Sequence, residues 1–224
     1  MFCAHYTPEC APADSPLRRA DKRSGSRPLL EAVGLTCCYS DSGRGIEGVN
    51  LCLERGSFTV VAGGRGAGKT TLLRALLGML PLQGGEIRWN GVSVSGLLAP
   101  DPGHASASPR CAYLAQARPE ESPSVCEGLA RLLESEAELL LMDDLSAALS
   151  DQEERTWWDA LFARRLFCRQ RTCLAVSNRQ AALSRADHIL VLREGRAAGE
   201  GRLEALLEGC AALRCLWERC AWAG

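Results

Sequence analysis

Short apolar runs alternate with helical patterns from Leu29 onward. The runs at 58–62 and 139–142 are apolar at nearly every position, which predicts strands buried on both faces. Similar strands are expected at 110–115, 172–177 and 188–192, with helices at 69–80, 124–136, 151–167 and 202–217. Strands that alternate with helices are typical of an α/β domain with a mostly parallel central sheet.

A second group of strands has a different pattern. Strands are expected at 29–39 and 49–53, and the segment 86–94 contains an Asn90-Gly91 pair. Asn-Gly favours positive φ at both central positions of a two-residue turn, so this segment predicts a β-hairpin. Residues 95–109 are rich in Pro, Ser, Ala and Gly and predict a loop.

The first part of the chain lacks apolar periodicity. Residues 1–27 carry prolines and a cluster of charged side chains, which predicts a flexible tail. The whole chain is 46% hydrophobic, and the part that follows the tail is long enough for one buried core, so we expect one domain over 28–220.

The charge balance and the cysteine positions exclude some classes of function. The chain has 26 basic and 27 acidic residues, so it has no overall field that would hold nucleic acid. Its 12 cysteines include no CxxC pair, which argues against zinc and favours buried thiols in a reducing compartment. No secretory signal or long apolar run is present, so we expect a soluble or peripheral protein whose membrane work needs another polypeptide.

The strongest motif lies between the strand at 58–62 and the helix at 69–80. Gly63-Gly64-Arg65-Gly66-Ala67-Gly68-Lys69-Thr70 matches G-x-x-x-x-G-K-[ST] in full. Glycines let successive N–H groups turn toward phosphates, and the helix N-terminus adds partial positive charge. Lys69 is expected at the β and γ phosphates of a nucleotide, and the Thr70 hydroxyl at Mg²⁺.

A buried strand that ends in acids supplies the second half of a magnesium site. The segment 139–144 reads Leu-Leu-Leu-Met-Asp-Asp. Asp143 is the expected magnesium partner, and Asp144 follows where a base would orient an attacking water; the alternative for Asp144 is a helix cap or turn residue.

The order of these segments resembles the nucleotide-binding domain of ABC transporters, especially exporter-like members, over about residues 29–217. In that family an aromatic residue at the position of Tyr39 stacks on adenine, and a glutamine at the position of Gln116 contacts Mg²⁺ and couples to the membrane partner. The segment 147–150 resembles the loop after the magnesium acid, Val176-Ser177-Asn178-Arg179 the switch segment, and 186–196 the closing strand pair.

Several residues depart from the family pattern. Asp144 replaces the usual glutamate, and its side chain is shorter by roughly 1.5 Å. Asn178 replaces the switch histidine, and Ser150 replaces an aspartate. The interval 117–142 holds neither the helical subdomain nor the Leu-Ser-Gly-Gly-Gln signature, and the stretch at 125–128 has a single glycine.

The resemblance implies an α/β P-loop NTPase fold with a mostly parallel central sheet, an antiparallel β subdomain and a truncated helical subdomain. It implies an ATP-binding subunit that binds ATP and Mg²⁺ and hydrolyses ATP at the inner face of the membrane, in the cytoplasm. The implied partners are a membrane-spanning transporter subunit and a second ATP-binding domain, in a homo- or heterodimer.

The candidate residues fall into three groups: nucleotide binding by Tyr39, Gly63, Gly64, Arg65, Gly66, Ala67, Gly68, Lys69, Thr70 and Thr71; magnesium binding by Thr70, Gln116 and Asp143; catalysis by Asp144, Gln116 and Asn178. Two alternatives stay open: a degenerate module that holds nucleotide without hydrolysing it, and a truncated cassette.

Overall fold

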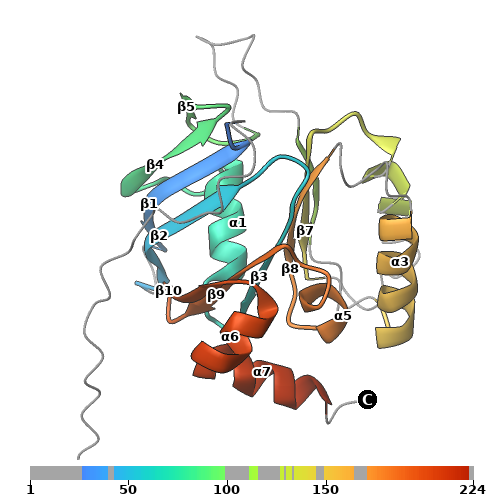
Figure 1. Ribbon diagram of the computed structural model, residues 1–224. Helices are drawn as coiled ribbons and strands as arrows, with labels where there is room; N and C mark the ends of the chain where they lie inside the picture. Colours follow the sequence, from blue (N-terminus) through green and yellow to red (C-terminus); the bar gives the residue numbers. More distant parts are fainter. Residues whose placement is uncertain are drawn as a thin grey trace, which may run out of the picture.

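The computed structural model describes residues 27–39, 43–98, 111–115, 127–128, 130–132, 134–144, 149–163 and 171–221. Helix α1 (Lys69–Leu77) lies between two sheets, and other helices cover the outer face of the larger sheet (Figure 1). The layers are therefore sheet, helix, sheet and helices. Residues 1–26 of the predicted tail and most of the predicted 95–109 loop lie outside the described residues, so the domain boundary stays a prediction.

The larger sheet carries the predicted parallel strands. Its strand order is β10-β9-β3-β8-β7-β6, and all neighbours are parallel except β9 and β10. The strands are β10 (Arg196–Gly201), β9 (His188–Arg193), β3 (Phe58–Gly63), β8 (Thr172–Val176), β7 (Leu139–Asp143) and β6 (Cys111–Leu114). This arrangement confirms the predicted α/β fold with a mostly parallel central sheet.

The smaller sheet is antiparallel, in the order β2-β1-β4-β5. Its strands are β2 (Gly45–Leu53), β1 (Leu30–Cys38), β4 (Gly84–Trp89) and β5 (Val92–Val94). Asn90 and Gly91 have φ of 52° and 80°, which confirms the predicted hairpin turn. Strand β2 begins before the predicted 49–53, because Ile46 is buried and pairs with Cys37 although polar residues follow it.

The parallel strands are buried on both faces. Along β7, Leu139 and Leu141 face α1 and the antiparallel sheet, whereas Leu140 and Met142 face the outer helices. The side-chain period of two in an extended chain sends alternate residues to opposite faces. Strands β3, β8 and β9 divide in the same way, which explains why their sequences are apolar at nearly every position.

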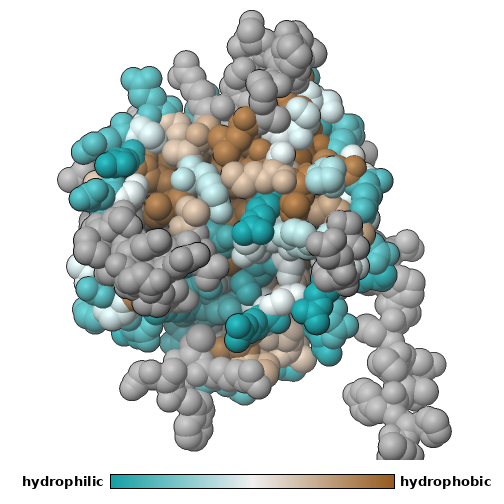
Figure 2. Space-filling view, turned by 180° about the vertical axis from the view of Figure 1, so that it is seen from behind, coloured by the Kyte–Doolittle hydropathy of each residue, from teal (hydrophilic) through white to brown (hydrophobic). Residues whose placement is uncertain are grey.

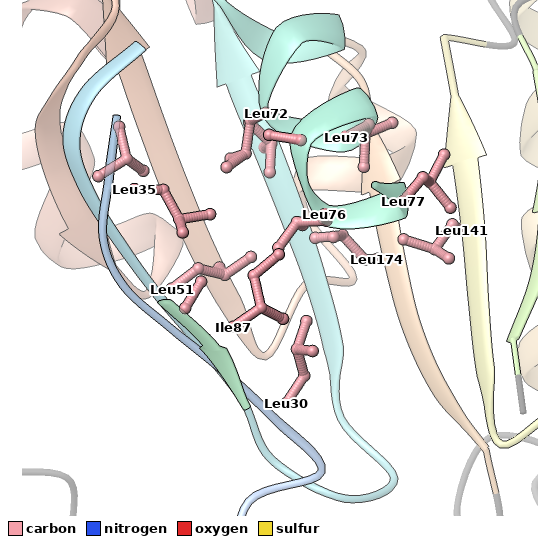
Figure 3. Close-up of a cluster of buried hydrophobic side chains, with 14 of the residues drawn as sticks. Leu30, Leu35, Leu51, Leu72, Leu73, Leu76, Leu77, Ile87, Leu141 and Leu174 are labelled. Carbon is pink, nitrogen blue, oxygen red and sulfur yellow. The ribbon is translucent and has the colours of Figure 1, made fainter. Parts of the chain in front are cut away.

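Leucines of α1 fill the space between the two sheets. Leu72, Leu73, Leu76 and Leu77 lie toward strands of both sheets (Figure 3). The helix ends at Leu77, before the predicted end at residue 80, because Gly78 adopts a left-handed φ of 79° and its N–H donates to the carbonyl of Ala75.

The outer helices are α3 (Asp151–Ala163), α5 (Gln180–Leu183), α6 (Leu203–Gly209) and α7 (Ala211–Ala221). The prediction of a single helix over 202–217 is wrong. The structure has two helices there, and Cys210 between them has an extended backbone with φ −114° and ψ 101°. Its buried thiol lies against the carbonyl of Ala198 in β10. Residues 164–167 of the helix predicted at 151–167 lie outside the described residues, as do parts of 124–136.

Apolar side chains gather on the upper part of the face seen in Figure 2. Met79 and Leu98 are 51% and 50% exposed. Met79 comes two residues after α1, and Leu98 lies beside the end of the helix, where its N–H donates to the carbonyl of Leu77. Among the described residues, no helix is both long enough and apolar enough to cross a membrane.

Leu76→Ala tests the central position of α1. Leu76 is fully buried between the sheets, so truncation should lower the free energy of unfolding by about 2–5 kcal/mol. Urea denaturation of the variant and of Met79→Ala, an exposed control, measures this. A loss as small as that of the control would contradict the packing described here.

Candidate functional site

The site lies at the carboxyl edge of the parallel sheet. Strands β3, β7 and β8 are parallel, and they end at Gly63, Asp143 and Val176. In register, Val176 pairs with Val61 on one side and with Asp143 on the other. The segments that follow these three strands therefore begin side by side, which is where ligands bind in open α/β sheets.

Glycine is required at two positions of the loop that follows β3. A Cβ on Gly63 would lie 2.4 Å from the carbonyl oxygen of Leu192, and a Cβ on Gly68 would lie 2.9 Å from Cγ2 of Ile46. Gly66 and Gly68 have φ of 76° and 101°, in the left-handed region. The loop therefore has the tight backbone path that its sequence predicts.

The loop leads directly into α1. Gly68 is the N-cap residue and offers no side chain, so the first N–H groups of the helix face the loop uncapped. Gly64, Arg65 and Gly66 are exposed at the outside of the turn, whereas Ala67 is buried and its carbonyl accepts from the Gly195 N–H. An anion above the loop would meet backbone donors and the positive end of the helix.

Lys69 is the positive charge of the site. Its Nζ donates to the carbonyl oxygens of Gly63 at 2.7 Å and Gly64 at 3.0 Å. Burial lowers the pKa of Lys69, and the carboxylates of Asp144 and Asp143 oppose this shift. The ammonium group thus lies over the loop, with both predicted acids near it.

Asp143 and Thr70, two of the residues predicted to bind magnesium, are joined by a hydrogen bond. The Thr70 hydroxyl donates to Oδ1 of Asp143 at 3.3 Å, and Asp143 is 1% exposed. Burial raises the pKa of Asp143, with Asp144 adding to the shift and the Thr70 hydrogen bond, Arg74 and Lys69 opposing it. A hydroxyl and a buried carboxylate beside a phosphate loop fit Mg²⁺, which takes few protein ligands and completes its shell with phosphate and water.

Asp144 follows Asp143 in a left-handed conformation with φ 39°. Its N–H donates to the carbonyl of Val176 at 3.1 Å, which fixes the residue against the end of β8. Its carboxylate favours a higher pKa for both Lys69 and Glu154, so it lies within electrostatic range of each group. A non-glycine residue with positive φ is uncommon, and such strain is concentrated at functional sites.

Asn178 lies next to the first residue of the loop. Its Oδ1 accepts from the Gly63 N–H at 2.9 Å, and its Nδ2 donates to the Gly63 carbonyl at 3.0 Å. The segment after β8 is therefore joined to the phosphate loop through the backbone of Gly63.

The remaining predicted residues are placed as follows. Tyr39 is half-buried, and its hydroxyl accepts from Arg74 of α1 at 3.2 Å, which brings the ring to the flank of the helix. Thr71 is buried within α1. Gln116 lies outside the described residues, directly after the end of β6 and Ala115.

Sequence reasoning missed a buried ion-pair cluster beside the site. Arg179 contacts Glu154 at 2.9 Å and Asp151 at 3.1 Å, and its guanidinium also donates to the carbonyl of Leu149 at 2.8 Å. Glu154 is 1% exposed and accepts from Nε1 of Trp158 at 3.0 Å. The acidic first turn of α3 was visible in the sequence, but nothing there identified Arg179 as its partner.

The cluster fixes α3 to the site. Burial raises the pKa of Glu154, and the bonds from Trp158 and Arg179 oppose the shift. Trp158 also packs on Phe58 of β3, with ring centroids 4.9 Å apart. Because Arg179 directly follows Asn178, the helix, the switch segment and the strand before the phosphate loop form one packed unit.

The site geometry agrees with comparisons to known proteins. The ABC transporter family model matches residues 46–127, which include the whole phosphate loop. The mycobactin import ATP-binding/permease protein IrtB of Mycolicibacterium thermoresistibile is 27% identical over 238 residues, covering 85% of this chain and 40% of that protein. The chain is therefore similar in sequence to ATP-binding proteins of the ABC transporter family.

A further relative resembles this chain over a shorter segment. The cytochrome c biogenesis ATP-binding export protein CcmA of Nitrosospira multiformis is 44% identical over 70 residues, covering 31% of this chain and 34% of that protein. The chain therefore aligns with 34% to 40% of the length of these relatives.

Solved structures confirm the fold. A bacterial Atm1-family ABC exporter with ATP bound has a TM-score of 0.69 at 18% identity, covering 88% of this chain and 42% of that one. MJ1267, an ATP-binding cassette of an ABC transporter in its ADP conformation, has a TM-score of 0.67 at 15% identity, covering 84% of this chain and 98% of that one. The chain therefore has the predicted P-loop NTPase fold.

Asp143→Asn tests the cost of the buried carboxylate. The folded pKa of Asp143 is raised, so the wild type gains stability as pH falls from the folded pKa toward 3.8. In EDTA at pH 7, Asp143→Asn should therefore raise the free energy of unfolding, by about 1 kcal/mol.

Chemical denaturation at pH 7 and pH 4 measures both parts of this expectation. The advantage of Asp143→Asn should shrink at pH 4, where the wild-type carboxyl takes up a proton in the fold. Asp159→Asn, at an exposed carboxylate of α3, is the control. A variant less stable than the wild type at pH 7 would contradict the electrostatic description.

Proposed function

We propose that this chain binds Mg-ATP at the carboxyl edge of its parallel sheet and hydrolyses it as the ATP-binding subunit of an ABC transporter. One observation carries the proposal: Lys69 and the Thr70–Asp143 pair meet over one glycine loop at a helix N-terminus. The family binds ATP with Mg²⁺ in general, and the donors of this site match that ligand in charge and type.

Each residue has a separate role in the proposed reaction. Lys69 and the N–H groups of the loop bind the β and γ phosphates, and Thr70, Asp143 and Gln116 hold Mg²⁺, which neutralises phosphate charge. Asp144 orients a water molecule for in-line attack on the γ-phosphorus. The water oxygen forms the new P–O bond, the bond to the β–γ bridging oxygen breaks, and ADP leaves with that electron pair.

Transport needs partners, which we propose to be a membrane-spanning subunit and a second ATP-binding domain, with this chain at the cytoplasmic face. The relatives support this through their names, which describe an export protein and an import ATP-binding/permease protein. Met79 and Leu98 are exposed apolar side chains at the end of α1. The thiol of Cys111 in β6 donates a hydrogen bond to the carbonyl of Leu97, the residue before Leu98. We propose that the surface of Met79 and Leu98, near the strand that leads to Gln116, contacts the membrane subunit.

A module that holds ATP without hydrolysing it is the second candidate. The observation that favours it is the hydrogen bonding of Asn178, whose carboxamide oxygen and nitrogen are both engaged by Gly63. Asparagine also lacks the titratable ring of histidine. The interval 117–142, with no signature sequence, points in the same direction because it offers no cap for the nucleotide of a partner domain.

Calorimetric titration with Mg-ATP, combined with phosphate-release assays, tests the proposed function. Lys69→Ala should weaken ATP binding at least about tenfold, because it removes a charge-assisted contact to phosphate. Arg55→Ala is the matched control, since it removes an exposed basic side chain that pairs with Glu138 away from the site. Asp144→Asn should retain binding and lower phosphate release about 100-fold.

The outcomes separate the candidates. Phosphate release by the wild type that depends on Lys69 and Asp144 supports a hydrolysing subunit. Binding that depends on Lys69, with no release above the Lys69→Ala background, supports the holding module. A wild-type chain that binds no ATP rules out both functions.

Tyr39→Ala tests the proposed adenine contact. Loss of base stacking should weaken ATP binding by about 1–3 kcal/mol. Tyr39→Phe, which keeps the ring and loses the hydroxyl that contacts Arg74, should bind nearly as well as the wild type. Inorganic tripolyphosphate should bind all three proteins equally, because it has no base, and a matching loss of its binding to Tyr39→Ala would refute stacking.

A further inference from the structure

Asn178 lies where the ladder between β3 and β8 comes to an end. The two strands pair one to one from Phe58 with Cys173 to Val61 with Val176. The Ser177 N–H still donates to the carbonyl of Val61 at 3.2 Å. Continuing this register places residue 178 opposite Gly63, and there the side chain of Asn178 makes the next two hydrogen bonds in place of backbone groups.

The chemistry of a carboxamide suits this position. The Gly63 N–H needs an acceptor and the Gly63 carbonyl needs a donor, so Oδ1 and Nδ2 of Asn178 have one satisfactory orientation. A carboxamide presents these two groups side by side, as a neighbouring strand would, whereas an imidazole nitrogen is either a donor or an acceptor. Asn178 thereby extends the sheet by one residue into the phosphate loop.

Gly63 connects this contact to the charged group of the site. Its carbonyl accepts from Asn178 at 3.0 Å and from Nζ of Lys69 at 2.7 Å. On the opposite side, Gly63 pairs with Leu192 of β9, whose carbonyl blocks any side chain at this position. The peptide of Gly63 is therefore held from both neighbouring strands, and the position of Lys69 depends on it.

We propose that Asn178 is a positioning residue that fixes the phosphate loop through Gly63, and that it does not contact the γ-phosphate. The proposal rests on the proposed nucleotide binding, and it makes a distinct statement about that site. A residue that contacts the γ-phosphate favours the binding of ATP over that of ADP. A residue that fixes the loop supports ATP and ADP alike, because both nucleotides place phosphates in the same loop.

The experiment compares Asn178→Ala, Asn178→Asp and Asn50→Ala with the wild type. Asn50→Ala is the matched control, since Asn50 also holds a backbone group, the Gly34 N–H at 2.8 Å, but in the antiparallel sheet. Asn178→Asp keeps the volume and the acceptor and loses the donor. Hydrogen–deuterium exchange of residues 63–70 without nucleotide and calorimetric titration with Mg-ATP and Mg-ADP are the two measurements.

Asn178→Ala should accelerate exchange in the loop about 10- to 30-fold, since two hydrogen bonds are lost, and Asn178→Asp should accelerate it by less. The affinities for ATP and ADP should fall by the same factor, roughly tenfold, while the Tm stays close to that of Asn50→Ala. Loop exchange equal to that of the wild type, or a loss confined to ATP, would overturn the proposal. If the wild type binds neither nucleotide, the proposed function fails, and the exchange measurement still decides the role of Asn178.

Discussion

The backbone of Gly63 is the constraint on which the rest of the site depends. Strand β3 is the central strand between β8 and β9, and Gly63 is its last residue. Its carbonyl accepts hydrogen bonds from Lys69 and Asn178, and the carbonyl of Leu192 leaves no room for a Cβ on Gly63. A loop that must wrap around phosphates has few internal hydrogen bonds of its own, so its geometry has to come from the strands that flank its first residue.

Buried charge is the second organising force, and it has two different forms. Glu154 is paired with Arg179 and bonded by Trp158, so its charge is compensated within the protein. Asp143 is equally buried, but its side-chain partner is the hydroxyl of Thr70, which compensates the charge less than a guanidinium does. Burial raises the pKa of both carboxyl groups. The buried carboxylate of Asp143 lowers the stability of the fold, which fits the cation binding proposed for it, whereas the Arg179 cluster fixes the surrounding elements.

Much of the fold and part of the site follow from the sequence because they depend on local rules. Continuous apolar runs identified strands buried on both faces, Asn90-Gly91 identified the hairpin, and the spacing of glycines before Lys69 identified the loop. The break at Cys210 could not be predicted, because the apolar pattern continues through it and the packing against β10 decides it. The Arg179–Glu154 pair was equally hidden, because an ion pair across elements leaves no trace in spacing.

Asn178 shows most clearly where sequence reasoning stops. Its position after β8 and its chemistry allowed a hydrogen bond to phosphate, and the structure shows the same two polar groups on the backbone of Gly63. The groups proposed to bind nucleotide are set by a rigid sheet edge and depend little on side-chain length. The proposed hydrolysis depends on the position of one carboxylate, that of Asp144, whose left-handed backbone is held by Val176, and displacements near 1 Å matter for such a role. Nucleotide binding, which we propose to depend on the backbone of Gly63, and turnover, which we propose to depend on Asp144, are therefore physically separable in this chain.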